Sequence, residues 1–134
     1  MSVSTLPIRI YYEDTDAGGV VYYANYLKFF ERGRTELLRE RDIEQDVLLE
    51  KNIAFVVKKV ELNYVKPALF NELLTVKTEI LVCRKASLQF KQEIFNENGE
   101  LLCAATTLIA CINTLKVKPM AIPSEIIEVI SSAR

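Results

Sequence analysis

The sequence predicts an α+β fold in which an antiparallel sheet packs against one long helix. Residues 24–41 repeat apolar side chains with the spacing of a helix. From residue 53 onward, the chain consists mainly of short segments rich in β-branched and aromatic residues, which are typical of strands. The 134 residues contain no repeat or linker, so we expect a single domain over residues 1–134.

The first predicted elements are a strand and the long helix. Residues 7–12, PIRIYY, alternate around Arg9 and predict a strand opened by its proline. Residues 13–22 are then expected to form a loop. Gly33 costs about 1 kcal/mol relative to Ala inside a helix, which indicates close packing of the helix on the sheet. The apolar spacing of the helix predicts this packed side: Tyr23, Tyr26, Leu27, Phe30, Gly33, Arg34, Leu37 and Leu38.

The second half of the chain predicts strands. Residues 44–52 are compatible with a short helix or a turn, and residues 124–130 with a terminal helix. The Asn-Gly pair at residues 98–99 predicts a hairpin, because Asn-Gly readily adopts positive φ. The strand of residues 101–113 is almost continuously apolar, so we expect it to be central and covered on both faces. The expected strands span residues 53–65, 73–83, 87–95 and 101–113.

The composition excludes several classes of function. A net charge of −1 and a pI of about 5.6 give no long-range field that favours nucleic acid, although local basic clusters could still hold a phosphate-bearing ligand. No apolar run approaches the roughly 20 residues of a membrane span, and the first residues do not resemble a signal peptide. We therefore expect a cytoplasmic protein without membrane insertion.

The chain contains no histidine. This excludes Ser-His-Asp and Cys-His catalysis and His-ligated zinc. Cys83, Cys103 and Cys111 are widely spaced in apolar contexts without a CxxC pair, so we expect buried thiols in a reducing compartment and no metal site. A cysteine nucleophile would lack its usual base. The expected reactive group of an enzyme is therefore a carboxylate, with Lys, Tyr and Cys as less favoured alternatives.

The most informative stretch is residues 13–36, EDTDAGGVVYYANYLKFFERGRTE. It gathers three acids and a Gly-Gly pair in a loop that directly precedes the long helix. Backbone N–H groups at a helix N-terminus lack intrahelical partners and carry partial positive charge, so they can polarise a carbonyl. A carboxylate nearby could then attack that carbonyl or act as a base. The alternative is an ordinary polar turn that only caps the helix.

This stretch closely resembles the signature of the 4-hydroxybenzoyl-CoA thioesterase-like hotdog proteins. It is most similar to the YbgC-type acyl-CoA thioesterases associated with the Tol–Pal system of Gram-negative bacteria. The resemblance continues through AFVVKKVELNYVKPA (54–68) and VKPMAIP (117–123), so it covers nearly the whole chain. It implies a hotdog fold, in which a five-stranded antiparallel sheet wraps around one long central helix. It also implies a homodimer or homotetramer with active sites between subunits.

The resemblance further implies the hydrolysis of an acyl-CoA thioester to a carboxylic acid and free CoA, with no metal and no bound cofactor. By position, the catalytic aspartate of the family corresponds to Asp16, which would act as nucleophile or as general base toward water. The backbone N–H of Tyr23 would polarise the thioester carbonyl, and Gly19 would shape the approach. The other residues of the motif are expected to hold the loop: Tyr12, Asp14, Gly18 and Tyr26.

Tyr23 departs from the YbgC-type pattern, which usually has His at this position. The 4-hydroxybenzoyl-CoA thioesterase itself resembles this chain in having Tyr there. If the role of this position belongs to its main-chain N–H, either side chain would serve. If some relatives use the His side chain, their chemistry and pH dependence need not transfer to this chain. A tyrosine side chain could narrow the acyl pocket, so the acyl preference stays open.

Coenzyme A carries phosphates, and the basic residues beside predicted loops are the candidates to bind them. Taken singly, each such basic residue is as compatible with an ordinary solvated surface position as with phosphate binding. Lys58 and Lys59 lie within a predicted strand and are weaker candidates, and Glu31 is interpreted as an exposed helix residue. The candidate substrate-binding residues are Arg84, Lys85, Ser87, Lys116 and Lys118.

The sequence leaves other partners and functions open. Acyl carrier protein could replace CoA as the carrier, because both present the same phosphopantetheine arm. A non-catalytic hotdog module that binds acyl carriers or envelope-associated proteins is a second class of function, and the intact loop motif argues against it. Hotdog dehydratases generally use a catalytic His and match this chain poorly.

Overall fold

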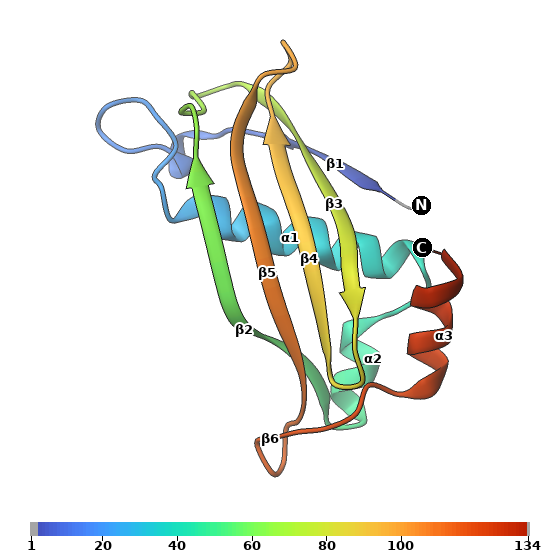
Figure 1. Ribbon diagram of the computed structural model, residues 1–134. Helices are drawn as coiled ribbons and strands as arrows, with labels where there is room; N and C mark the ends of the chain where they lie inside the picture. Colours follow the sequence, from blue (N-terminus) through green and yellow to red (C-terminus); the bar gives the residue numbers. More distant parts are fainter. Residues whose placement is uncertain (1–2, 134) are drawn as a thin grey trace.

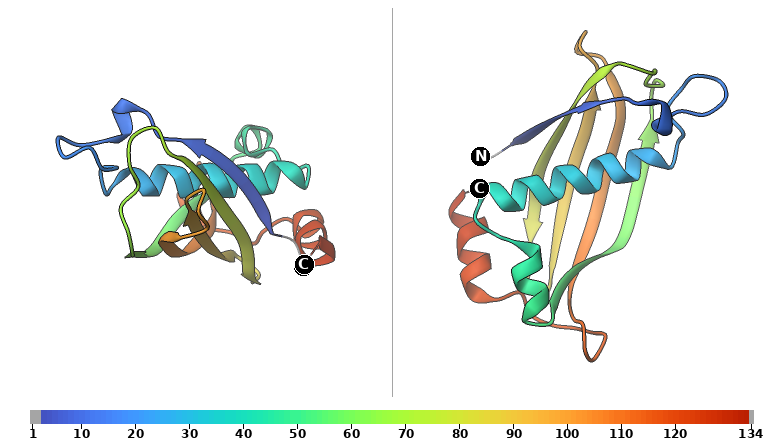
Figure 2. Two further views of the ribbon diagram at one scale, coloured as in Figure 1. Left: turned by 90° about the horizontal axis from the view of Figure 1, so that it is seen from above. Right: turned by 180° about the vertical axis from the view of Figure 1, so that it is seen from behind.

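One long helix lies across a face of a curled antiparallel sheet (Figures 1 and 2). The computed structural model describes residues 3–133, so the ends of the predicted domain, residues 1–2 and 134, lie outside the described residues. The helix is α1 (Asn25–Glu40). The strands are β1 (Ser4–Arg9), β2 (Ile53–Tyr64), β3 (Leu73–Cys83), β4 (Ser87–Phe95) and β5 (Leu101–Asn113), in the order β1-β3-β4-β5-β2. All their pairings are antiparallel.

The α+β class and three strand boundaries are confirmed: β3, β4 and β5 begin and end where the sequence predicts. Residues 44–52 form the helical alternative, α2 (Gln45–Glu50), and the terminal helix is α3 (Ser124–Ala133). A two-residue strand, β6 (Lys118–Pro119), adds to the five expected strands by pairing with β5. No helix within residues 3–133 combines the length and apolar character needed to cross a bilayer.

The predicted first strand, residues 7–12, is wrong at both ends. β1 begins at Ser4 and ends at Arg9, so Pro7 lies inside the strand. This is possible because β1 is an edge strand that pairs only with β3, and a proline there leaves no ladder donor unpaired in the sheet. The Tyr11 N–H donates instead to the Asp14 carboxylate at 2.8 Å, which turns the chain out of the sheet.

Helix α1 packs closely on the sheet at Gly33, as predicted. A Cβ atom at this position would lie 2.7 Å from Thr78 Oγ1 and 2.9 Å from Val76 Cγ1, both on β3. Tyr23 and Leu27 are exposed, unlike the rest of the predicted packed side, because Tyr23 precedes the helix and the buried stripe passes to one side of Leu27. The buried residues of α1 are Asn25, Tyr26, Phe29, Phe30, Gly33, Arg34, Leu37 and Leu38.

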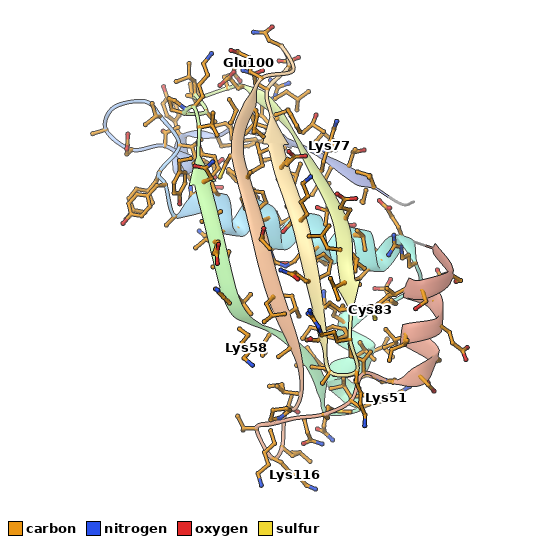
Figure 3. All side chains as sticks on the ribbon, viewed as in Figure 1. Lys51, Lys58, Lys77, Cys83, Glu100 and Lys116 are labelled. Atoms are coloured by element: carbon orange, nitrogen blue, oxygen red, sulfur yellow. The ribbon has the colours of Figure 1, made fainter. Side chains whose placement is uncertain are left out.

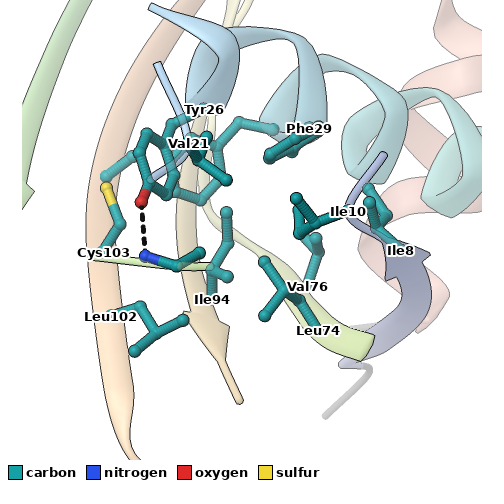
Figure 4. Packing of buried hydrophobic residues seen from close by; sticks show 13 residues of the cluster. Ile8, Ile10, Val21, Tyr26, Phe29, Leu74, Val76, Ile94, Leu102 and Cys103 are labelled. Atoms are coloured by element: carbon teal, nitrogen blue, oxygen red, sulfur yellow. Dashed lines mark hydrogen bonds between the residues drawn. The ribbon is translucent and has the colours of Figure 1, made fainter. Parts of the chain in front are cut away.

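The core contains two apolar clusters with buried polar side chains between them. One cluster surrounds the N-terminal half of α1 and is shown in Figure 4, and the other surrounds its C-terminal half. The Nε2 group of Gln92 on β4 donates to the Phe30 carbonyl at 2.8 Å and to Thr78 Oγ1 at 2.9 Å. Arg34 Nη1 donates to Gln92 Oε1 at 3.0 Å. These bonds fix the position of α1 on the sheet, since a buried polar group requires its partners.

Strand β5 is interior to the sheet, as predicted, because it pairs with both β4 and β2. The expectation that it is covered on both faces is wrong for the single chain. Its side chains alternate between buried and half-exposed along the strand. Helix α1 covers only one face of the sheet, and the other face of β5 is lined by half-exposed residues such as Ala104, Thr106 and Leu108.

Candidate active site

The loop between β1 and α1 forms a small hairpin that rests on the connection between β2 and β3. Thr15 and Val21 pair across the hairpin, and Val20 pairs with Leu69. The Val21 N–H also donates to the Ala68 carbonyl at 2.9 Å. The hairpin projects beyond the end of β2, at the upper left of Figure 1.

Asp16 and Gly19 form the turn of this hairpin. The Gly19 N–H donates to the Asp16 carbonyl at 3.1 Å, and φ of Gly19 is 79°, a left-handed value that glycine adopts without strain. Asp16 Oδ1 accepts the Gly18 N–H at 2.8 Å. Asp16 is exposed, and its Oδ2 has no donor among residues 3–133. The turn therefore orients the carboxylate through one oxygen and leaves the other available.

The N-terminus of α1 has no side-chain cap among residues 3–133. Ala24 occupies the N-cap position and no side chain accepts a hydrogen bond there, so the alternative in which the loop acids cap the helix is wrong. The Tyr23 N–H has no acceptor within the described part of the chain, whereas the Tyr22 carbonyl of the same peptide accepts the Asn25 N–H at 2.8 Å. An oriented N–H at a helix start is a suitable donor to a carbonyl that gains negative charge.

Asp14 and Asn25 join the hairpin to the helix. The Asp14 carbonyl accepts the Tyr22 N–H at 2.8 Å and the Asn25 Nδ2 group at 3.1 Å. Sequence reasoning assigned a holding role to Asp14 and overlooked Asn25, whose place inside the YANY run could have marked it as a polar residue on a buried helix face. The convergence of the Asp16 carboxylate and the Tyr23 N–H on one substrate stays a prediction.

Tyr26 on α1 and Cys103 on β5 lie in the buried cluster behind this junction. The buried hydroxyl of Tyr26 accepts the Ala68 N–H at 3.1 Å, which is the dashed line in Figure 4, and burial raises the pKa of Tyr26. Burial also raises the pKa of the Cys103 thiol to about 12. Cys103 is thus protonated at neutral pH and is not a nucleophile. Within the described chain, none of the cysteines forms a disulfide, and no group of acids and cysteines could hold a metal ion.

The candidate CoA-binding residues lie at the opposite end of the sheet. Tyr64, beside Tyr23, pairs with Cys103 of β5, whereas Lys118 pairs with Asn113 of the same strand. Ten residues of strand separate these positions, which is about 33 Å. Figure 3 shows Lys116 at the far end, opposite Glu100. The other candidates, Arg84, Lys85 and Ser87, lie at the turn from β3 to β4 at this same end.

Comparison with known proteins places these features in a family. A family model described as the thioesterase-like superfamily matches residues 11–130. The chain belongs to this superfamily. The sequence-based resemblance to hotdog thioesterases of the YbgC type is thereby confirmed, and so are the class of enzyme and the hotdog fold.

Individual members of the superfamily cover almost the whole chain. Acyl-CoA thioester hydrolase YbgC of Escherichia coli O6:H1 is 47% identical over 121 residues, 90% of each chain. Acyl-CoA thioesterase YbgC of Haemophilus influenzae is 46% identical and covers 91% of this chain and 90% of its own. The crystal structure of DHNA-CoA thioesterase from Staphylococcus aureus matches with a TM-score of 0.94 at 29% identity, over 98% of this chain and 91% of that chain.

Proposed function

We propose that this member of the thioesterase-like superfamily hydrolyses acyl-CoA thioesters, with Asp16 as the reactive carboxylate and the Tyr23 N–H as the donor to the thioester carbonyl. One observation carries the assignment of residues: an exposed carboxylate and an unpartnered helix-start N–H belong to the same hairpin–helix junction. The 47% identity to a relative named acyl-CoA thioester hydrolase supports the reaction.

The chemistry requires only the thioester and water. Asp16 attacks the carbonyl carbon itself, or it takes a proton from the water that attacks. Either route places negative charge on the carbonyl oxygen, where the Tyr23 N–H stabilises it. The C–S bond then breaks, the thiolate of the carrier leaves and takes up a proton, and water supplies the oxygen of the released acid. No metal or bound cofactor takes part in this route.

The geometry of one chain supports a site shared by two chains. The cations near Lys118 lie about 33 Å of strand away from the Tyr23 end, so one chain does not bring both to one substrate. Strand β2 is an edge strand, and Val56 and Val57 on it are exposed. Antiparallel pairing of two β2 edges around a twofold axis would place the cations of one protomer beside the hairpin of the other.

The proposed assembly is therefore at least a homodimer. The half-exposed face of β5 offers a further contact through which dimers would form a homotetramer. CoA and acyl carrier protein both present a phosphopantetheine arm, and the cations suit the phosphate of either carrier. The buried thiols Cys103 and Cys111 are consistent with a reducing cytoplasm as the place of the reaction.

Substitution of Asp16 tests the role of its carboxylate. Asp16→Asn keeps an oxygen to accept the Gly18 N–H but removes the charge, so we expect the hairpin to persist and thiol release from acyl-CoA to fall at least about 100-fold. Glu13→Gln is the matched control, because Glu13 is an exposed acid of the same segment. Equal turnover by wild type and Asp16→Asn would exclude Asp16 as the reactive carboxylate. If wild type binds acyl-CoA but releases no thiol, the non-catalytic binding module is favoured instead.

Mixing two inactive variants tests the shared site. One variant carries Asp16→Asn, and the other replaces the distant cations by Gln: R84Q, K85Q, K116Q and K118Q. In a mixed dimer, one site combines an intact Asp16 with intact cations of the partner chain. Co-refolded mixtures should regain about a quarter of wild-type turnover, since half the dimers are mixed and each has one working site. No regain of turnover would place both groups in one chain.

A further inference from the structure

A small cavity under β2 contains a buried charge that the proposed active site does not use. The cavity has a volume of about 110 Å³ and lies between α1, α2 and the sheet. Its walls are largely apolar and include Phe55, Leu88, Phe90 and Ile109. Arg34, eleven residues after Tyr23 in the sequence, lines the cavity. That spacing corresponds to about 16 Å along a helix, so the cavity is separate from the thioester carbonyl.

Arg34 is buried and bonds directly to no acid among residues 3–133, although the effect of burial on its pKa is partly offset by the charge of the Glu31 carboxylate. The residue is only 9% exposed, and it forms no ion pair within residues 3–133. Its Nη1 donates to Gln92 Oε1, and its other guanidinium nitrogens have no acceptor among these residues. Burial lowers the pKa of Arg34, and an arginine nevertheless stays charged at neutral pH. A buried arginine is rarely left without a carboxylate, because its desolvation is then uncompensated.

Gln92 holds the guanidinium in a fixed orientation. The Gln92 Nε2 group donates to the Phe30 carbonyl and to Thr78 Oγ1, so its Oε1 must face Arg34. Gln92 is 1% exposed and has no room to turn away. The donors of Arg34 are thus pre-organised, and a planar guanidinium fork matches a carboxylate with two parallel hydrogen bonds.

Glu31 favours the charged form of Arg34 through its own charge but does not bond to the guanidinium. Glu31 lines the same cavity, but it is exposed and accepts the Thr35 hydroxyl proton rather than an Arg34 N–H. Thr35 in turn accepts Gln45 Nε2 at 3.3 Å. The polar residues of the lining therefore bond to one another and leave the Arg34 donors available.

We propose that this cavity binds a short carboxylate, with its charged group on Arg34 and its carbon body between the apolar walls. An apolar cavity of about 150 Å³ holds benzene, so this one suits a body of about four carbon atoms. The ligand is a free short-chain acid or the far end of an acyl group that ends in a carboxylate. The first source is independent of the proposed function, and the second rests on it.

Titration calorimetry of the full chain with isobutyrate and isovalerate tests the proposal. Wild type should bind both acids. It should bind the neutral isobutyramide at least about tenfold more weakly than isobutyrate, because a hydrogen bond to a charged group is worth about 1.5–3 kcal/mol. Arg34→Gln should lower the affinity for isobutyrate at least about tenfold. Glu31→Gln should raise this affinity, because it removes a charge of the same sign as the ligand. Arg32→Gln is the control, since Arg32 is exposed on the same helix and stacks on Phe29 outside this cavity.

Two outcomes overturn the proposal. The first is that wild type binds isobutyrate and isobutyramide with equal affinity, or does not bind the acids at all. This measurement uses wild type alone, so it decides the question even if Arg34→Gln does not fold. The other is equal affinity of Arg34→Gln and wild type for isobutyrate.

Turnover assays then distinguish the two sources of the carboxylate. A free-acid site leaves the KM for straight-chain acyl-CoA unchanged when isobutyrate is added. A site for the acyl terminus makes isobutyrate compete, and Arg34→Gln then raises KM for carboxyl-ended acyl-CoA but not for its methyl-ended analogue. Loss of all turnover in Asp16→Asn with retained isobutyrate binding would separate this site from the proposed reaction.

Discussion

The hydroxyl of Tyr64 donates a hydrogen bond to the carbonyl of Tyr23 at 2.9 Å. This contact joins the last residue of β2 to the residue that precedes the N-cap of α1. The two rings also meet edge to face at 6.4 Å, and the Tyr64 ring contacts Tyr26 in the same way at 5.5 Å. Tyr64 thus holds the peptide that directly follows the proposed N–H donor, and so restrains Tyr23 from its C-terminal side.

Tyr64→Phe removes this hydroxyl and keeps the ring. We expect kcat for acyl-CoA hydrolysis to fall about tenfold with KM nearly unchanged, because a loosened Tyr23 N–H stabilises the transition state less than before. The free energy of unfolding in urea should drop by only about 1 kcal/mol. Tyr11→Phe, which removes an exposed hydroxyl, is the control. A fall in stability alone, with kcat retained, would contradict the positioning role.

Gly33→Ala should destabilise the fold although alanine is the better helix former. The added Cβ would lie within 3.0 Å of three β-sheet atoms, including Gln92 Nε2. Overpacking of this kind costs about 1–3 kcal/mol and outweighs the gain of about 1 kcal/mol in helix propensity. Urea unfolding measures the difference, with Lys28→Ala on the exposed side of α1 as control. Increased stability of Gly33→Ala would show that the sheet yields at this contact.

Cys103 should make the fold sensitive to alkaline pH. Its thiol keeps a proton to about pH 12 in the folded chain, whereas the unfolded thiol loses it near pH 9. Above that pH the unfolded state binds fewer protons, so stability falls as pH rises. From pH 8 to 10.5, wild type should lose about 2 kcal/mol more unfolding free energy than Cys103→Ala. Parallel pH profiles of the two proteins would show that burial does not hold this proton.

The buried pair of Arg34 and Gln92 illustrates what local patterns leave undecided. Helical spacing correctly placed Arg34 on the packed side of α1. Its partner lies on β4, 58 residues later in the chain, and no spacing rule identifies such a partner. The first strand was misplaced for a related reason. Alternation and Pro7 alone do not reveal that β1 is an edge strand, on which a proline can sit inside the ladder.

By itself, the sequence determined the fold class, the ends of three strands, the close approach at Gly33 and the motif that carries Asp16 and Tyr23. These features depend on periodicity and on residues that are neighbours in the chain. Only the tertiary structure decided that Tyr64 reaches the Tyr23 carbonyl, that Arg34 bonds to Gln92 rather than to an acid, and that the cations near Lys118 lie far from the hairpin. Such relationships arise from strand register and helix packing, which bring together segments that the sequence keeps tens of residues apart.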